Sequence, residues 1–247
     1  AVEVQSDAPA WYSPNRILSV SEFATWSDVV SWAQPLYDQA AVVDPSVQQL
    51  ADQLAAGKDP AGKVVAALHF VQQEIRYLGM EDGIGSHRPR RAADTLYRRY
   101  GDCKDKTVLL MALLKAMGFA PTAALVSLDQ GAALPNQQPS PYLFDHVIVT
   151  LLLNGKRIWL DGTELNQGDN LQTIAVPYFR YALPLSKGVT TLLPMDGEYR
   201  SPEIQVRHEL WVQNDQNRLV VESRYQGKMA EQQRSQCVGV LVRGDHA

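Results

Sequence analysis

The hairpin signal within residues 144–163 constrains the fold more than any other part of this sequence. Two apolar runs, 147–153 and 156–161, are separated only by the dipeptide Asn154-Gly155. Asn-Gly between two such runs is the strongest short signal for a two-residue turn, because both positions of that turn need positive φ. The turn also sets the register, since the residues on either side of it must pair with each other. The sequence therefore predicts an antiparallel β-hairpin.

The predicted register places a histidine and an aspartate on the same face of the hairpin. His146 then lies opposite Thr163, and Ile148 lies opposite Asp161. Diagonal neighbours on one face are about 7–8 Å apart at the backbone, within reach of an imidazole and a carboxylate that lean toward each other. A slip of one residue would separate them. The opposite face is apolar and is expected to pack on the core: Val147, Val149, Leu151, Leu153, Ile158 and Leu160.

Cys103 lies in the first turn of a predicted helix that runs from about Asp102 to Met117 and ends at Gly118. Leucines cover so much of this helix that we expect it to be buried centrally. Free backbone N–H groups and the helix dipole at its start favour an anion, so the position stabilises a thiolate. The neighbouring Asp102 and Asp105 are expected to cap the helix and complement its dipole rather than to transfer protons.

A thiol, an imidazole and a carboxylate are the parts of a nucleophilic acyl-transfer site. In such a site His146 takes the proton of Cys103 and returns it to the leaving group, while Asp161 orients the imidazole and offsets its charge. The Cys103 N–H is the natural first donor to an oxyanion, and the sequence identifies no second donor. Taken alone, a helix-start cysteine is more often an inert structural thiol. The residues by themselves leave both roles open.

Three further helices are expected before the cysteine helix. Helical spacing of apolar residues begins near Ser21. Asp44–Pro45 and Asp59–Pro60 each combine an N-cap residue with a proline in the first turn, so they predict two helix starts. The second of these helices is expected to continue to Leu78 and to end at Gly79.

The remaining segments predict loops and strands. Residues 81–91 mix glycine, proline and charge and predict a loop, whereas 122–128 predict a strand. The polar stretch 129–141 predicts a long loop that is either a lid over the site or a disordered connector. Residues 203–212 and 218–225 predict a second hairpin, which would open a small β-region.

Composition excludes several classes of function. The chain has 247 residues and a net charge of −4, so a nucleic-acid partner is not expected. No apolar run reaches the roughly 18 residues that a membrane-spanning helix needs. Its two cysteines, Cys103 and Cys237, form no Cys-x-x-Cys pair and no His/Cys cluster, so a structural zinc site is not expected. No other cofactor is expected. The chain begins at Ala1 without a methionine, which suggests a mature or trimmed protein.

Several other residues have competing explanations. His69 falls in an apolar helical stripe and is expected in the core, and His87 falls in an arginine-rich loop. Trp159 shares the predicted face of the histidine and aspartate, where it would shield the site from water or simply fill the core. Five arginines would bind an acidic substrate or, more simply, form a solvated face with some ion pairs: Arg88, Arg90, Arg91, Arg98 and Arg99.

The motifs in this chain resemble the core of bacterial transglutaminase-like proteins. Residues 101–107 read GDCKDKT and precede a leucine-rich helix that ends in Gly118-Phe119. Residues 144–147 read FDHV and residues 159–163 read WLDGT, like the second and third motifs of that superfamily. The upstream segments 75–77 and 89–96 also fit. The resemblance covers about residues 20–195 and is specific because the motifs occur together.

The resemblance implies an α+β, papain-like fold in which N-terminal helices and a cysteine-bearing helix pack on an antiparallel sheet. It matches Cys103 to the nucleophile, His146 to the base and Asp161 to the orienting carboxylate. It also implies a lead-in at 1–20, a core at 21–195 and the start of a C-terminal β-region at 196–247.

Several reactions are compatible with such a core. The expected one is hydrolysis of peptide or amide bonds through a thioester, with a protein or peptide as substrate and no cofactor. The alternatives are transfer of an amine to protein glutamine, and an inactive peptide-binding scaffold. Larger relatives are commonly exported, which favours a periplasmic or cell-surface setting over a cytoplasmic one. The sequence does not give the oligomeric state.

Overall fold

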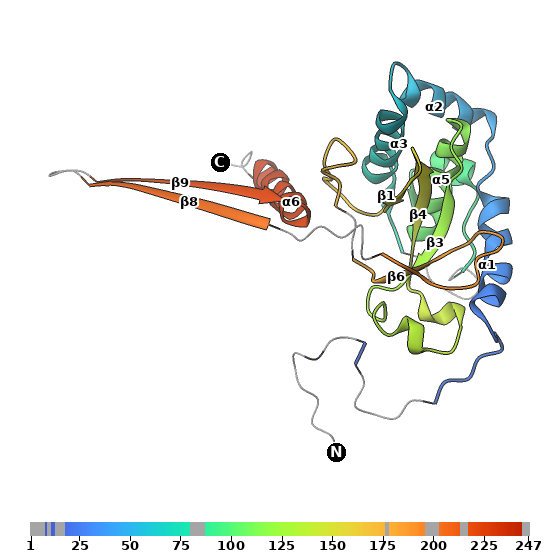
Figure 1. Cartoon of the computed structure of the whole chain (residues 1–247). Helices are drawn as coiled ribbons and strands as arrows, with labels where there is room; N and C mark the ends of the chain where they lie inside the picture. The colour runs from blue at the N-terminus through green and yellow to red at the C-terminus, as the bar shows by residue number, and fades with distance from the viewer. Residues whose placement is uncertain are drawn as a thin grey trace. The chain divides into compact units, whose positions relative to one another are not determined.

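The computed structural model describes residues 8, 11–12, 18–79, 87–175, 178–195, 203–212 and 217–243 of the chain, without side chains beyond 237. These residues belong to two compact units, which are considered separately. The first unit comprises Ala1–Glu164 and Tyr178–Glu198. The second comprises Leu165–Pro177 and Tyr199–Ala247. The helices and strands of both are labelled in Figure 1.

The first unit is built on a five-stranded antiparallel sheet with the strand order β5-β4-β3-β6-β7. The unit combines this antiparallel sheet with α-helices, so the predicted α+β class is confirmed (Figure 1). The strands are β3 (Thr122–Val126), β4 (His146–Leu153), β5 (Lys156–Leu160), β6 (Tyr181–Pro184) and β7 (Leu193–Pro194).

The predicted hairpin is confirmed in its turn and in its register. Asn154 and Gly155 have φ values of 51° and 77°, the positive values that a tight two-residue turn requires. Leu153 pairs with Lys156, and the ladder continues along both strands. The expectation of one buried face was incomplete, because Ile148 on the other face is only 1% exposed. Both faces of β4 are therefore covered near the histidine.

The described part of the first unit contains five α-helices: α1 (Trp26–Ala40), α2 (Pro45–Ala55), α3 (Pro60–Glu74), α4 (Ala92–Arg98) and α5 (Cys103–Ala116). The two Asp-Pro signals mark helix starts as predicted. Asp44 accepts a hydrogen bond from the Val47 N–H at 2.9 Å, and Asp59 accepts one from the Gly62 N–H at 2.7 Å. Each aspartate therefore satisfies a backbone donor that the first turn leaves free.

Two predicted helix boundaries are wrong. Helix α1 begins at Trp26 rather than near Ser21, because Thr25 and Asp28 form a reciprocal capping box there. Helix α3 ends at Glu74 rather than at Leu78. The residues that follow form strand β1 (Arg76–Tyr77), which pairs in parallel with β2 (Tyr100–Gly101). That pairing is long-range and overrides the local helical pattern. Helix α4 was not predicted at all.

Helix α5 lies at the centre of the first unit, as its leucine content predicts. It packs against β4 and β3, and it also contacts α2, α3 and α4 (Figure 1). Every residue from Cys103 to Leu114 is buried. This stretch includes polar side chains, and the exposed fraction is only 4% for Lys104, 2% for Asp105 and 1% for Lys106. Such groups need partners inside the protein.

The segment 129–141 is folded between β3 and β4. It contains a short 3₁₀ helix, Leu134–Asn136, and Pro141 begins another one, Pro141–Leu143. Leu134 is completely buried. The alternative of a disordered connector is therefore wrong, whereas a lid function stays a prediction. Most of the loop predicted at 81–91 lies outside the described residues.

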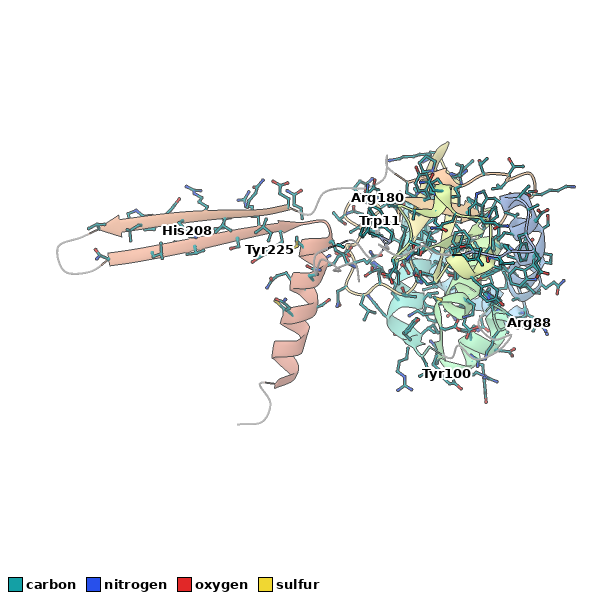
Figure 2. All side chains as sticks on the ribbon, turned by 90° about the horizontal axis from the view of Figure 1, so that it is seen from below. Trp11, Arg88, Tyr100, Arg180, His208 and Tyr225 are labelled. Atoms are coloured by element: carbon teal, nitrogen blue, oxygen red, sulfur yellow. The ribbon has the colours of Figure 1, made fainter. Side chains whose placement is uncertain are left out.

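The second unit contains the other predicted hairpin and one helix that was not predicted. Strands β8 (Glu203–Val212) and β9 (Asn217–Gln226) pair antiparallel along their whole length, and α6 spans Lys228–Arg243. Figure 2 shows side chains standing on both faces of this ribbon. None of the helices in the described part of the chain is long and apolar enough to cross a membrane.

Candidate active site

The start of α5 is capped by Asp102, as predicted. One carboxylate oxygen of Asp102 accepts hydrogen bonds from the backbone N–H groups of Lys104 at 2.9 Å and Asp105 at 3.1 Å. The Asp102 carbonyl accepts the Lys106 N–H at 3.0 Å. Among the described residues, these bonds occupy the first-turn donors that follow Cys103 and leave the Cys103 N–H uncommitted. A free N–H directly beside the sulfur is what an oxyanion site needs.

Paired charges surround this helix start. The Asp105 carboxylate accepts hydrogen bonds from the Arg90 backbone and guanidinium, both at 2.8 Å, so it anchors a loop rather than only complementing the helix dipole. The Lys104 ammonium lies 2.7 Å from Asp102. Close packing also requires Gly101, because a Cβ there would lie 2.5 Å from the Asp105 Cβ. Arg90 therefore forms one of the ion pairs predicted for the arginine-rich segment, with its side chain 32% exposed.

His146 and Asp161 meet as the hairpin register predicts. The His146 Nε2 atom lies 2.8 Å from one carboxylate oxygen of Asp161. The other oxygen accepts hydrogen bonds from the Thr163 N–H at 2.8 Å and the Thr163 hydroxyl at 2.6 Å. Gln72, on α3, donates to the Asp161 carbonyl at 2.8 Å. Both the side chain and the backbone of the aspartate are thus fixed in place.

The charged state of this pair follows from opposing effects. Burial by itself lowers the pKa of His146, but its hydrogen bonds to Asp161 and Cys103 and the charges of both outweigh burial and raise the pKa to about 10. Burial raises the pKa of Asp161, yet hydrogen bonds to His146 and Thr163 and the His146 charge lower it overall. At neutral pH the imidazole is therefore protonated and the carboxylate is ionised.

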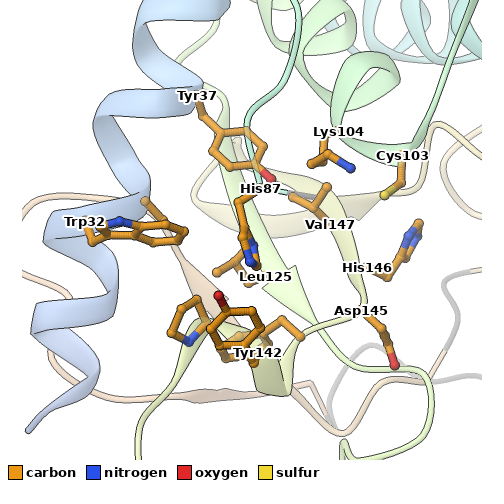
Figure 3. Close-up of a pocket in the computed structure, with 13 residues that line it drawn as sticks. Trp32, Tyr37, His87, Cys103, Lys104, Leu125, Tyr142, Asp145, His146 and Val147 are labelled. Atoms are coloured by element: carbon orange, nitrogen blue, oxygen red, sulfur yellow. The ribbon is translucent and has the colours of Figure 1, made fainter. Parts of the chain in front are cut away.

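Cys103 completes the arrangement. Its side chain is hydrogen-bonded to His146. With Nε2 committed to Asp161, Nδ1 is the imidazole nitrogen that remains for the sulfur. Figure 3 shows the Cys103 sulfur and the His146 ring close together on one side of the cavity. The structure thus brings together all three residues that the sequence singled out.

Cys103 and His146 border a cavity of about 270 Å³, whereas Asp161 lies behind the histidine and does not line it. Part of it is a group of rings that the sequence did not predict (Figure 3). The His87 ring makes edge contacts with Trp32 and Tyr142, at centroid distances of 5.2 and 5.0 Å. Burial and the nearby charge of Lys104 lower the pKa of His87. These rings come from separate segments, so no local sequence signal places them together.

Trp159 and His69 do not belong to this cavity. Trp159 is 3% exposed, pairs with Thr150 in the ladder and fills the core, which is one of its two predicted roles. The cavity is lined mainly by α1, the start of α5 and the strands and loops around β4. No group of three or more potential metal ligands occurs among the described residues.

Comparison with known proteins identifies the core. Residues 48–127 match the family model of the transglutaminase-like superfamily, named Transglut_core. The match confirms the predicted resemblance over this segment. The matched segment includes Cys103, whereas His146 and Asp161 follow it. No curated protein matches the sequence.

Two solved structures are similar to this chain. The first is of a putative protease from Parabacteroides distasonis ATCC 8503, with a TM-score of 0.51, 16% identity, and coverage of 76% of this chain and 35% of that chain. The second is of a putative cysteine protease from Cytophaga hutchinsonii, with a TM-score of 0.41, 15% identity, and coverage of 76% and 55%. The chain thus spans about a third and about half of these proteins. At such low identity the first likeness shows a shared fold.

Proposed function

We propose that this chain is a cysteine-dependent enzyme that cleaves peptide or amide bonds through a thioester on Cys103. One observation carries the proposal: His146 is hydrogen-bonded to both Cys103 and Asp161 at the wall of a cavity. An inert structural thiol needs no such arrangement. A nucleophilic thiol needs a base, a group that orients the base and space for a carbonyl group.

The reaction follows from the positions of these groups. The Cys103 thiolate attacks the carbonyl carbon, and the electron pair of the C=O bond moves to oxygen. The oxyanion that forms accepts a hydrogen bond from the Cys103 N–H. When the intermediate collapses, the C–N bond breaks and the leaving amine takes the proton from His146. Water then attacks the thioester, and His146 removes a proton from it. The C–S bond breaks, which releases the carboxylic acid and restores the Cys103 thiolate beside the His146 imidazolium.

The same first step is compatible with other outcomes. If an amine replaces water as the acceptor, the enzyme joins an amine to an acyl group instead of hydrolysing it. If no acyl group is transferred at all, the fold serves as a peptide-binding scaffold. The cavity is open and partly aromatic, which suits a protein or peptide segment as the substrate.

The proposal is tested with p-nitrophenyl acetate, an activated ester that reacts with nucleophilic thiols. We expect intact-mass and peptide mapping to find an acetyl group on Cys103, and the thioester to decay in water. Cys103→Ser and His146→Ala should abolish this modification. Adding a primary amine separates hydrolysis from transfer, because transfer yields the acetylated amine. Absence of an acetyl group on Cys103 in the wild-type protein contradicts the proposal and favours the scaffold.

A further inference from the structure

Tyr37 is a buried phenol at the cavity that none of the steps above uses. It lies on α1, is 3% exposed and lines the same cavity as Cys103. Figure 3 shows its ring reaching from α1 into the cavity, with the hydroxyl end directed toward the α5 side. Because α1 is folded around buried residues on either side of it, the ring has a fixed position. A fixed side chain at a reaction site is suited to a specific contact.

The hydroxyl group of Tyr37 makes no hydrogen bond with any described residue of the chain. A buried tyrosine hydroxyl normally has a partner, because the apolar ring is stable inside the protein but the O–H group is not. Here the Tyr37 side chain borders the cavity instead. Its hydroxyl is therefore available to form a hydrogen bond with a molecule that binds in the cavity.

The charges around Tyr37 show that its hydroxyl lies near the start of α5, and they determine its protonation state. Burial raises the pKa of Tyr37, and so do the negative charges of Cys103, Asp102 and Asp105, in that order. All three belong to the start of α5, so the phenol oxygen lies within their field. The phenol consequently stays protonated across the physiological range. It can donate a hydrogen bond but does not supply a negative charge.

We propose that the Tyr37 hydroxyl is the second oxyanion donor, acting together with the Cys103 N–H. This inference rests on the proposed function. As the thiolate forms the S–C bond, the electron pair of the carbonyl moves to oxygen, and the Tyr37 O–H and Cys103 N–H donate hydrogen bonds to that oxygen. Both protons stay on their donors throughout. The bonds weaken again when the C=O bond re-forms and the leaving group departs.

Lys104, another polar residue that lines the cavity, is less suited to this role. The Lys104 ammonium is held by Asp102 at 2.7 Å, and only 6% of its side chain is exposed. Moving it to an oxyanion would leave a buried carboxylate unpaired, which is costly. Tyr37 has no such bond to break. A donor that needs no rearrangement gives the larger stabilisation of a transition state.

The test compares two reactions of the same thiol. Acylation by p-nitrophenyl acetate passes through an oxyanion, whereas alkylation by iodoacetamide displaces iodide and forms none. Tyr37→Phe removes only the hydroxyl. We expect it to slow acylation of Cys103 by about 100-fold and to leave its alkylation rate unchanged. The matched control is Tyr97→Phe on α4, where the side chain is 89% exposed; both rates should equal the wild-type rates.

Each outcome has one interpretation. If the wild-type protein is not acylated, the proposed function is wrong and the role of Tyr37 falls with it. If the wild-type protein and Tyr37→Phe are acylated equally fast, only the role of Tyr37 is overturned. Equal slowing of acylation and alkylation overturns it as well, because the hydroxyl then acts on the thiolate.

A second substitution covers the case in which Tyr37→Phe does not fold. A fluorinated tyrosine at position 37 keeps the shape of the side chain and lowers the phenol pKa. We expect acylation to decline at a lower pH than in the wild-type protein, with no change in the pH dependence of alkylation. An unchanged acylation profile contradicts the inference.

Discussion

Polar side chains are buried at the start of α5, whereas apolar side chains are exposed in the β8–β9 ribbon. At the start of α5, Lys104, Asp105 and Lys106 are 4%, 2% and 1% exposed. In the ribbon, Leu210 and Val212 are 63% and 74% exposed. Burial here follows the availability of partners rather than polarity. Charges are buried where the fold supplies counter-charges and hydrogen bonds.

Register explains the ribbon's two faces. The cross-strand pairs place charged and amide groups on one face, together with Trp211 and Arg218. The other face is largely apolar, and six of its side chains are between 47% and 74% exposed: Ile204, Val206, Leu210, Val212, Leu219 and Val221. A contiguous exposed apolar strip of this kind is uncommon on a soluble monomer. The ribbon therefore depends on backbone pairing more than on a core of its own.

The largest expected effect is on the chemistry at α5. Asp161→Asn keeps the shape of the side chain but removes the charge that holds His146 as an imidazolium. We expect acylation of Cys103 by p-nitrophenyl acetate to slow by about 10⁴-fold, as for the carboxylate that orients the histidine in a Ser-His-Asp triad. Stopped-flow release of p-nitrophenol measures the rate, and circular dichroism controls for folding. A near wild-type rate contradicts the role of Asp161.

The next largest effect is expected on the stability of the protein when a buried charge at the start of α5 is removed. Asp105→Asn removes the carboxylate that accepts two hydrogen bonds from Arg90. We expect the free energy of unfolding to fall by about 2–3 kcal/mol, less than for a fully buried pair because the Arg90 side chain is 32% exposed. Urea denaturation measures the change. A loss below about 0.5 kcal/mol means that this charge behaves like a surface charge.

The stability of the His146–Asp161 pair should depend on pH. The His146 pKa is raised above 6.5 to about 10, so its contribution is complete below about pH 6.5 and is lost as the pH rises through 10. The Asp161 pKa is lowered from 3.8, so its contribution is present above that value and is lost as the pH falls through the lowered pKa.

Comparing the wild-type protein with His146→Ala by urea denaturation isolates this contribution. We expect the difference in unfolding free energy to shrink by about 4 kcal/mol between pH 7 and pH 11, because the pKa of His146 is raised from 6.5 to about 10. A difference that stays constant over this range shows that His146 is neutral in the folded protein.

The smallest effect is expected in the ribbon. Leu210→Ser on the apolar face and Glu209→Ser on the polar face should each change the free energy of unfolding by no more than about 0.5 kcal/mol, because both side chains are largely or partly exposed. The same urea experiment measures both. A loss of about 2 kcal/mol or more for Leu210→Ser alone would mean that the apolar face is covered in solution, and the contrast with α5 would fail.

Local chemistry predicted much of this architecture. The turn at Asn154-Gly155 set the register that unites His146 and Asp161, and Asp-Pro dipeptides marked two helix starts. These features depend on residues within a few positions of one another. The capping box at Thr25 was equally local, since Thr25 and Asp28 are three residues apart, and it would have corrected the start of α1.

What the sequence could not supply was pairing between distant segments. Helix α3 ends early because Arg76 and Tyr77 pair with β2, and no pattern within α3 reveals that partner. The group of rings around His87 consists of residues from three segments of the chain. The sequence did not indicate a role for Tyr37 at the site for a related reason. A tyrosine on an apolar helical stripe predicts only packing in the core. Its free hydroxyl becomes apparent only when α1 is placed beside α5.

The two cysteines provide the most direct test of the central claim, that Cys103 is an activated nucleophile. Cys237 is exposed, whereas Cys103 is only 4% exposed. If access alone governed reactivity, Cys237 would react first. With limiting iodoacetamide at pH 7, we expect peptide mapping to find Cys103 alkylated at least about tenfold faster than Cys237, and we expect His146→Ala to remove this advantage. Faster labelling of Cys237 in the wild-type protein, or equal labelling that His146→Ala does not change, contradicts the account.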